Sequence, residues 1–298
     1  MPRVVTPDVL AAAQRGFRTS FQLGLTSTST LYQSLATVVN STSSEEVYGW
    51  LGDIPKLREW IGDRQVKSLE SKGYTIRNKK FEATIGVEKD DIEDDKLGLY
   101  APRFQMMGNS AALHPDEVTF DLINGGATNM CFDGQSFFDV DHPVGKGINK
   151  RSFSNFAAGS GALWILADLS KPLKPWIFQK RRDYNFVSKE DPDKSDSVFL
   201  KDQFLYGVDA RVAAGYGFWQ MAFGSTDTLD AANLKEAYTQ MTEYTDDEGR
   251  KLNIKPTHII VGNTNTFNAR EIIMSKEIGG STNTLQNLVQ IMEAPLLN

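Results

Sequence analysis

The chain has 298 residues, of which 40 % are hydrophobic and 23 % are charged. These proportions are ordinary for a globular protein of about two domains, and they exclude a disordered chain, a collagen and a disulfide-stapled mini-protein. Lys and Arg number 32 against 38 Asp and Glu, a net charge of -6. A protein that neutralises phosphates is usually strongly basic, so this charge argues against a dedicated nucleic-acid binder.

Several sequence features are missing. Cys131 is the single cysteine, so no disulfide framework or Cys-rich zinc site is expected, and a reducing compartment is indicated. No apolar run reaches the roughly 18 residues that span a bilayer, and the first ten residues lack the apolar stretch of a signal peptide. We therefore expect no membrane association.

The first sixty residues do not have the pattern of a compact domain. A short helix is predicted over 8–21, with Asp8 as its N-cap. Ser/Thr-rich stretches at 26–30 and 41–44 flank an apolar cluster at 31–39. Two interpretations stay open: a flexible N-terminus, or an arm that buries its apolar patches on a neighbouring subunit.

The region from 53 to 89 reads as a short helix followed by strands. The helix is predicted over 53–61, with Asp53 as N-cap and Gly62 as its end. Strict alternation predicts a strand over 81–88, a shorter run at 74–76 resembles it, and 66–69 is the expected partner. We expect a lysine-rich β-hairpin that must pack on something, because a two-stranded hairpin is marginal in water.

An acidic run at 90–95 precedes a helical pattern. Acids in a first turn offset the helix dipole, and carboxylates without fixed spacing are weak metal ligands, so a helix start is favoured over a metal site. The helix is expected to continue to Ile123 with a break at Pro115. It would hold about 30 residues and be about 45 Å long.

The pattern of the remaining half predicts strands followed by α/β structure. A charged loop is predicted over 188–197. Predicted strands lie at 163–166, 176–179, 204–208, 215–223, 257–262 and 288–292, and predicted helices at 229–244 and 265–274.

The search for chemistry finds one weak candidate. Asp139, Asp141 and His142 could together bind a divalent cation, although their spacing matches no metal motif, and the alternative is a turn fixed by Asp141 and the His-Pro pair. His258 and Cys131 are interpreted as packed core residues.

Known catalytic and phosphate-binding motifs are missing from the sequence. It contains no phosphate loop and no nucleophile elbow. The basic run 180–182 is interpreted as a solvated edge or an intersubunit salt bridge. We expect no catalytic, cofactor-binding or metal residues and no enzyme activity. Arms and hairpins without cores reach other subunits, so the pattern indicates an assembly protein.

An ordered set of stretches resembles the major head (capsid) subunits of Mu-like transposable phages and prophages. The stretches are VYGWLG and LREW (47–52, 57–60), KKFE (79–82), EDDKLG and YAP (93–98, 100–102), HPDE (114–117), FDGQSFF (132–138), KPWIFQ (174–179), AGYGFWQMA (214–222) and KPTHIIV (255–261). They cover about 50–290, nearly the whole chain. The family is similar to the Hong Kong 97-type capsid proteins of tailed phages.

The resemblance implies an α+β Hong Kong 97-type fold with four parts. These are an N-arm at 1–62, an extended β-hairpin loop at 63–89, a peripheral domain at 90–125 and 165–224 with a long spine helix, and an axial domain at 126–164 and 225–298. The strands at 163–223 would extend the sheet of the peripheral domain. The crossing between domains near 126–164 is the least defined boundary.

The resemblance also implies the function. The chain would self-assemble as pentamers and hexamers into an icosahedral shell that encloses double-stranded DNA without sequence-specific binding. Portal, scaffold and decoration proteins are the implied partners, the virion is the location, and assembly takes place in the bacterial cytoplasm. Some relatives cross-link through a Lys–Asn isopeptide bond; here we expect non-covalent locking. The alternatives are an encapsulin-like shell around protein cargo, and a metal-dependent enzyme built on Asp139, Asp141 and His142.

Overall fold

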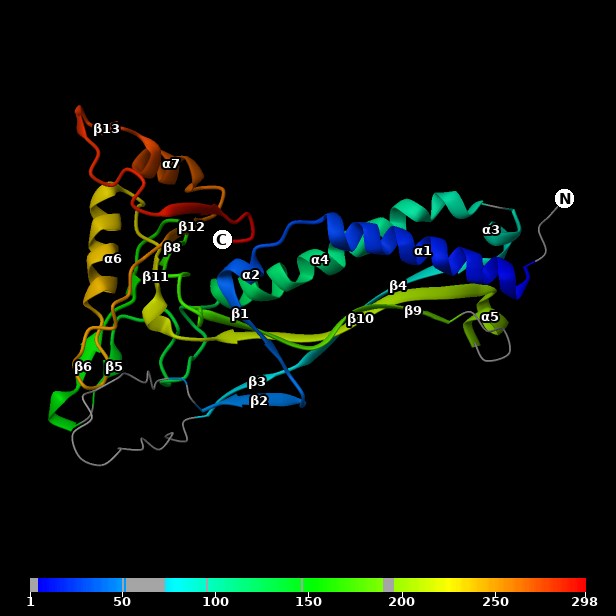
Figure 1. The fold of residues 1–298 in the computed structure, drawn as a ribbon, viewed down its shortest axis with the longest axis horizontal. Helices are drawn as coiled ribbons and strands as arrows, with labels where there is room; N and C mark the ends of the chain where they lie inside the picture. The colour runs from blue at the N-terminus through cyan, green and yellow to red at the C-terminus, as the bar shows by residue number, and fades with distance from the viewer. Residues whose placement is uncertain (1–4, 50, 52–72, 95, 146, 190–195) are drawn as a thin grey trace.

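The computed structural model describes residues 5–49, 51, 73–94, 96–145, 147–189 and 196–298. These residues form a compact lobe and an elongated lobe that extends from it (Figure 1). The helix predicted at 53–61 and the strand predicted at 66–69 lie outside the described residues.

The elongated lobe is built on a four-stranded sheet in the order β1-β9-β10-β4. Its strands are β1 Ala36–Asn40, β4 Lys79–Glu88, β9 Trp176–Lys189 and β10 Gln203–Tyr216. β9 and β10 run antiparallel along the lobe, β4 is antiparallel to β10, and β1 is parallel to β9. The helices α1 (Pro7–Ser27) and α4 (Ala101–Asn124) lie side by side over one face of this sheet (Figure 1).

The helix α1 is longer than predicted, and its N-cap lies two residues earlier. Thr6 is its N-cap and accepts a hydrogen bond from the Val9 N–H, while Asp8 lies in the first turn. The helix continues to Ser27, inside the Ser/Thr-rich stretch, and the Thr26 hydroxyl donates to the Gln22 carbonyl one turn back. Tertiary contacts thus override the weak local propensity.

The prediction of an arm without its own core is wrong for the described residues. Phe17 of α1 stacks on Phe104 of α4, with ring centroids 4.3 Å apart, and packs edge-on against Tyr206 of β10. Leu35, which follows in α2 (Tyr32–Leu35), is fully buried in the largest core cluster. The apolar patches of this segment are therefore buried on the same chain.

A close helix crossing depends on two glycines. A side chain at Gly24 would overlap the carbonyl oxygen of Gln105, and one at Gly108 would overlap that of Phe21. Because neither residue has a Cβ, the backbones of α1 and α4 approach directly. Periodicity does not reveal this contact, since it depends on two segments eighty residues apart in sequence.

The acidic run begins a short separate helix and not the long one. α3 spans Lys89–Glu93, a 3₁₀ turn follows at Lys96–Leu99, and α4 begins at Ala101. The Tyr100 hydroxyl donates to Asp91 at 2.5 Å. α4 continues through Pro115 without the predicted break and is about 36 Å long.

The strand predicted at 74–76 exists with a different partner. β3 (Tyr74–Arg77) pairs antiparallel with β2 (Glu45–Tyr48), and β4 continues from it after Asn78. This β2–β3 ribbon packs on the sheet face opposite the helices, where Ile76 of the ribbon and Ile177 and Ala213 of the sheet belong to one buried cluster.

The compact lobe contains a five-stranded sheet in the order β15-β12-β8-β11-β7. Its strands are β7 Phe156–Ala157, β8 Trp164–Ala167, β11 Ala222–Ser225, β12 His258–Val261 and β15 Gln290–Glu293, and its helices are α6 Ala231–Glu243 and α7 Thr266–Met274. The expectation that all strands at 163–223 extend the other sheet is wrong for β8 and β11. The predicted strand at 215–223 divides into the end of β10, a 3₁₀ turn at Trp219–Met221 and β11.

Smaller elements complete the described fold. They are α5 Asp196–Lys201, a 3₁₀ turn at Gly147–Asn149, and the paired short strands β5 His142–Val144 with β6 Arg151–Phe153 and β13 Glu277–Ile278 with β14 Ser281–Thr282.

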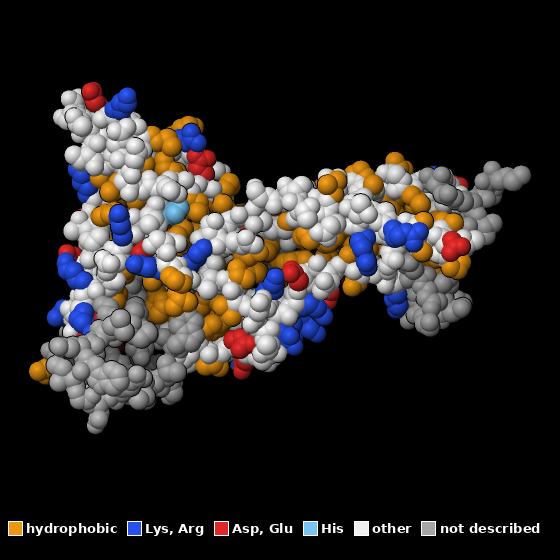
Figure 2. Space-filling model, in the orientation of Figure 1, with side chains coloured by type: hydrophobic (Ala, Val, Ile, Leu, Met, Phe, Trp, Pro, Cys, Tyr) orange, Lys and Arg blue, Asp and Glu red, His pale blue; other side chains and the backbone are white. Residues whose placement is uncertain are grey.

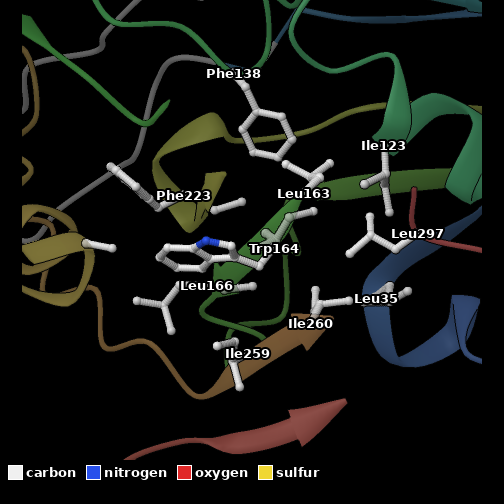
Figure 3. Close-up of a cluster of buried hydrophobic side chains, with 14 of the residues drawn as sticks. Leu35, Ile123, Phe138, Leu163, Trp164, Leu166, Phe223, Ile259, Ile260 and Leu297 are labelled. Atoms are coloured by element: carbon white, nitrogen blue, oxygen red, sulfur yellow. The ribbon is translucent and has the colours of Figure 1, made fainter. Parts of the chain in front are cut away.

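The main core lies where the two lobes join. Figure 3 shows Trp164 and Leu166 of β8 among side chains of β11 and β12, with Ile123 from the end of α4 close to Leu163. The Trp164 indole donates to the Asp227 carbonyl at 2.9 Å, which satisfies its polar atom inside the core. Both lobes share this core, so they form one folding unit at the junction.

We predict that Gly24→Ala lowers the free energy of unfolding by about 1–3 kcal/mol, because the added methyl group overpacks a backbone crossing. Gly16→Ala on the same helix is the matched control, since nothing lies within 4 Å of its added Cβ. That control should be neutral or gain about 0.4–1 kcal/mol. Urea unfolding of the subunit measures both, and equal effects would contradict the observed crossing.

Candidate functional site

One cluster of potential metal-ligating groups stands out among the described residues. Ligand atoms of Cys131, Asp133 and His142 lie within 4.8 Å of one another. Cys131 and Asp133 lie in the loop that leads from α4 into the compact lobe, and His142 begins β5. His142 is fully buried, and the Asp133 side chain is 10 % exposed.

The His142 ring has an oxygen partner at each nitrogen. Nδ1 lies 2.7 Å from Asp133 Oδ2, and Nε2 lies 3.1 Å from Asn155 Oδ1. The ring also stacks on Trp219, with centroids 4.0 Å apart and an interplanar angle of 9°. The imidazole is therefore fixed in position and in rotation.

The orientation of the Asn155 side-chain amide shows which nitrogens of the His142 ring carry a proton. Its Nδ2 donates to the carbonyls of Phe137, Trp219 and Ala222, at 2.8, 3.3 and 3.2 Å. The amide nitrogen must face these acceptors, so the amide oxygen faces His142. Both ring nitrogens then donate, and the geometry fits a positively charged imidazolium paired with the Asp133 carboxylate.

The charge of Asp133 is maintained by its hydrogen bonds. Burial alone would raise its pKa, but hydrogen bonds from His142 and Cys131 outweigh burial and hold the pKa below the ordinary value of 3.8. Burial raises the pKa of the Cys131 thiol, which donates to Asp133 Oδ1 at 3.1 Å.

This arrangement can hold loops together but is poorly suited to catalysis or metal binding. The thiol is protonated, the imidazole nitrogens are both engaged as donors, and Trp219 covers the ring. A buried pair with every polar atom satisfied stabilises one loop conformation. We interpret the cluster as a structural pin between the 131–142 loop, Asn155 and the 3₁₀ turn at Trp219.

The residues proposed from sequence do not form one site. Asp141 is exposed and accepts a hydrogen bond from the Gln135 side chain at 2.9 Å, and Asp139 Oδ1 accepts from the Val140 N–H. The His142 ring nitrogens instead contact Asp133 and Asn155. The true partners are nine residues before it and thirteen after it, a spacing for which the sequence offers no signal.

The other two histidines, His114 and His258, are half-buried, and each ring lies within hydrogen-bond distance of a hydroxyl group. His114 Nδ1 lies 2.5 Å from the Tyr184 hydroxyl, and burial lowers its pKa. His258 Nδ1 lies 2.9 Å from Thr257 Oγ1, and burial lowers its pKa too. Cys131 is buried, as predicted.

The exposed surface carries features that an isolated subunit does not need. Phe267 and Met274 lie seven residues apart on α7, hence on one helix face, and are 78 % and 57 % exposed. Figure 2 shows hydrophobic side chains on the upper part of the compact lobe, around α7. Among the described residues, no helix is both long enough and apolar enough to cross a membrane.

Comparison with known sequences gives consistent matches. A family model described as the Mu-like prophage major head subunit gpT matches residues 10–297. The major capsid protein of Escherichia phage Mu is 42 % identical over 288 residues, which cover 94 % of each chain. The Mu-like prophage FluMu major head subunit of Haemophilus influenzae is 42 % identical over 265 residues, which cover 86 % of each chain.

Solved structures match over both lobes. A subunit of the bacteriophage JBD30 procapsid has a TM-score of 0.86 and 41 % identity, covering 98 % of this chain and all of that one. A JBD30 capsid subunit has a TM-score of 0.79 and 32 % identity, covering 99 % and 100 %. A subunit from a JBD30 capsid decorated with minor capsid protein trimers has a TM-score of 0.76 and 33 % identity, covering 90 % of each chain.

We predict that Asp133→Asn lowers the free energy of unfolding at pH 7 by about 1–3 kcal/mol, because the buried imidazolium loses its counter-charge. The folded state lowers the pKa of Asp133, so its carboxylate stabilises the fold above the unfolded-state pKa. That contribution is lost as pH falls through the folded-state pKa, below 3.8. The difference between the variant and the wild type should therefore shrink below pH 4 in urea titrations. Asp139→Asn is the control. An equal loss of unfolding free energy in that variant would contradict the structural role of the Asp133–His142 pair.

Proposed function

Because the chain belongs to the Mu-like prophage major head subunit family, we propose that its copies assemble as pentamers and hexamers into the icosahedral head of a tailed phage. Membership makes the chain a major capsid protein of a Mu-like phage, with the α+β Hong Kong 97-type fold. It is a structural component of the virion and not an enzyme.

The observation that carries the proposal is the likeness to a procapsid subunit over 98 % of the chain at a TM-score of 0.86. At 41 % identity, this likeness extends beyond the core to the whole elongated lobe. The exposed apolar face of α7 supports it, because large apolar side chains gathered on a surface usually mark an interface.

We assign the parts of the fold as follows. The elongated lobe is the peripheral domain, with α4 as its spine helix, and the compact lobe is the axial domain. The β2–β3 ribbon is the base of the extended loop, and α1 with α2 and β1 forms the N-arm. The chain crosses between domains after α4, at 168–175 and at 217–221, so β8 and β11 belong to the axial domain. These assignments revise the ranges expected from sequence.

We infer the partners of the protein from its proposed role as a shell that encloses DNA. Portal, scaffold and decoration proteins are the proposed protein partners, and a JBD30 capsid carries minor capsid protein trimers. The shell encloses double-stranded DNA without sequence-specific binding, and it assembles in the bacterial cytoplasm. A net charge of -6 suits an inner wall to which DNA does not adhere.

Interface burial is the proposed mechanism of assembly. Obligate interfaces commonly bury more than about 2,000 Å² and are strongly apolar. Non-covalent contacts lock neighbouring subunits here. Within the described part of the chain, Lys79, Lys80 and Lys89 of the lysines expected near the loop lie on or just after β4.

We predict that the protein, expressed with its scaffold, forms closed icosahedral particles visible by electron microscopy. In infected cells these particles should contain nuclease-resistant DNA, because the shell encloses a genome. Expression alone should yield shells or capsomers. Monodisperse monomers under both conditions would contradict the proposal, and particles that hold only protein would favour a cargo shell.

We predict that Asp141→Ala leaves assembly unchanged and that purified particles hold no stoichiometric metal, because Asp141 lies apart from the His142 pin. Metal analysis and particle yield measure this. Loss of a bound metal together with an activity would instead support the enzyme alternative.

A further inference from the structure

Three basic side chains form a row across the open face of the elongated sheet. Lys80 of β4 lies opposite Arg211 of β10, and Arg211 lies opposite Arg182 of β9. We call these three residues the basic row. Figure 2 shows Lys and Arg side chains gathered beneath the middle of the elongated lobe.

The row points away from α1 and α4. Phe81, next to Lys80, contacts His114 of α4 with ring centroids 4.2 Å apart, so its neighbours in the strand point to the opposite face. Arg182 reaches that same face, because it forms an ion pair with Asp209 of β10. Beyond the row, toward the compact lobe, the β2–β3 ribbon covers the sheet.

In an isolated subunit, the three positive charges of the basic row repel one another. Like charges directly opposite one another destabilise a strand pair. Within the described residues, the Arg182–Asp209 pair is the one ion pair that the row makes, and Nε of Arg211 is buried without a hydrogen-bond partner. Register shifts on both sides of Arg211 mark β-bulges, which re-aim side chains. An anionic ligand would relieve this arrangement.

Carboxylates fit the row better than a phosphate backbone does. The guanidinium fork of Arg binds a carboxylate through two hydrogen bonds. Glu82 and Asp209 occupy the next cross-strand pair on the same face, so the positive surface is short and matches a few carboxylates better than the continuous charge of DNA. The overall charge of -6 also disfavours binding of DNA.

The chain itself contains a dense source of carboxylates in and beside α3. Four of the five residues from Asp90 to Asp94 are acidic, and this segment lies at the far end of the elongated lobe (Figure 1). Asp90 is exposed. β4 separates it from Lys80 by ten residues, about 30 Å of rigid strand, so one copy cannot join the two.

We propose that the basic row binds the acidic segment Asp90–Asp94 of a second copy of this chain. The contact is head-to-tail, since two different surfaces meet, and such contacts build rings and shells. The inference rests on the proposed shell function and names one of its subunit interfaces.

Charge reversal and charge swapping test the contact. Lys80→Glu should lower particle yield about tenfold, and Asp90→Lys should do the same, since each places like charges together. The double variant Lys80→Glu with Asp90→Lys should restore the yield, because each copy then presents the swapped pair. Lys79→Glu is the matched control, an exposed lysine adjacent in β4 that points to the other face. Sedimentation and electron microscopy measure the yield, and far-ultraviolet circular dichroism verifies folding of each subunit.

The outcomes separate the possibilities. Normal assembly of Lys80→Glu, or a double variant that stays as defective as its parents, would overturn the inference. Normal shells with reduced DNA content would overturn it in favour of a phosphate ligand. If Lys80→Glu fails to fold, Lys80→Gln should still lower the yield, and an unchanged yield would refute the contact. A wild type that forms no particles would refute the shell function itself.

Discussion

The antiparallel pairing of β9 with β10 is the constraint on which the rest of the structure depends. Each strand has 14 residues and is about 45 Å long. One end of the pair lies in the main core, and the other end lies in the core beneath α1 and α4. Trp176 and Tyr216 lie opposite each other in the main core, whereas Tyr206 lies in the core under α1 and α4. The two lobes are thus joined by continuous hydrogen-bonded strands and not by a flexible linker.

Buried polar networks hold the connecting segments against this frame. Asp116, in the middle of α4, accepts hydrogen bonds from the backbone N–H groups of Leu31 and Tyr32, at 2.9 and 2.7 Å, and so fixes the start of α2. Burial raises the pKa of this carboxyl. The His142 pin acts in the same way on the segment that follows α4. Because a buried polar group without a partner is costly, each network specifies one arrangement of its loop.

A shell subunit needs a lobe that reaches beyond its own core. The sheet of the elongated lobe is covered by helices on one face and by the β2–β3 ribbon on only part of the other. The apolar face of α7 also stays exposed, although monomeric proteins seldom leave large apolar side chains gathered on their surface. These surfaces make sense when further copies of the chain surround the subunit.

The sequence by itself determined the elements whose pattern is local. Helical periodicity located α6 and α7 to within a few residues, and short continuous apolar runs located the buried strands β8 and β12. The ordered motifs also identified the capsid family. Only the tertiary structure decided what pairs across long distances: that α1 packs on α4 through Gly24 and Gly108, that β8 joins the compact lobe, and that His142 meets Asp133 and not Asp139. The physical reason is that these contacts depend on how segments approach in space, where backbone clearance and hydrogen-bond geometry select the partner, and neither leaves a periodic trace in the chain.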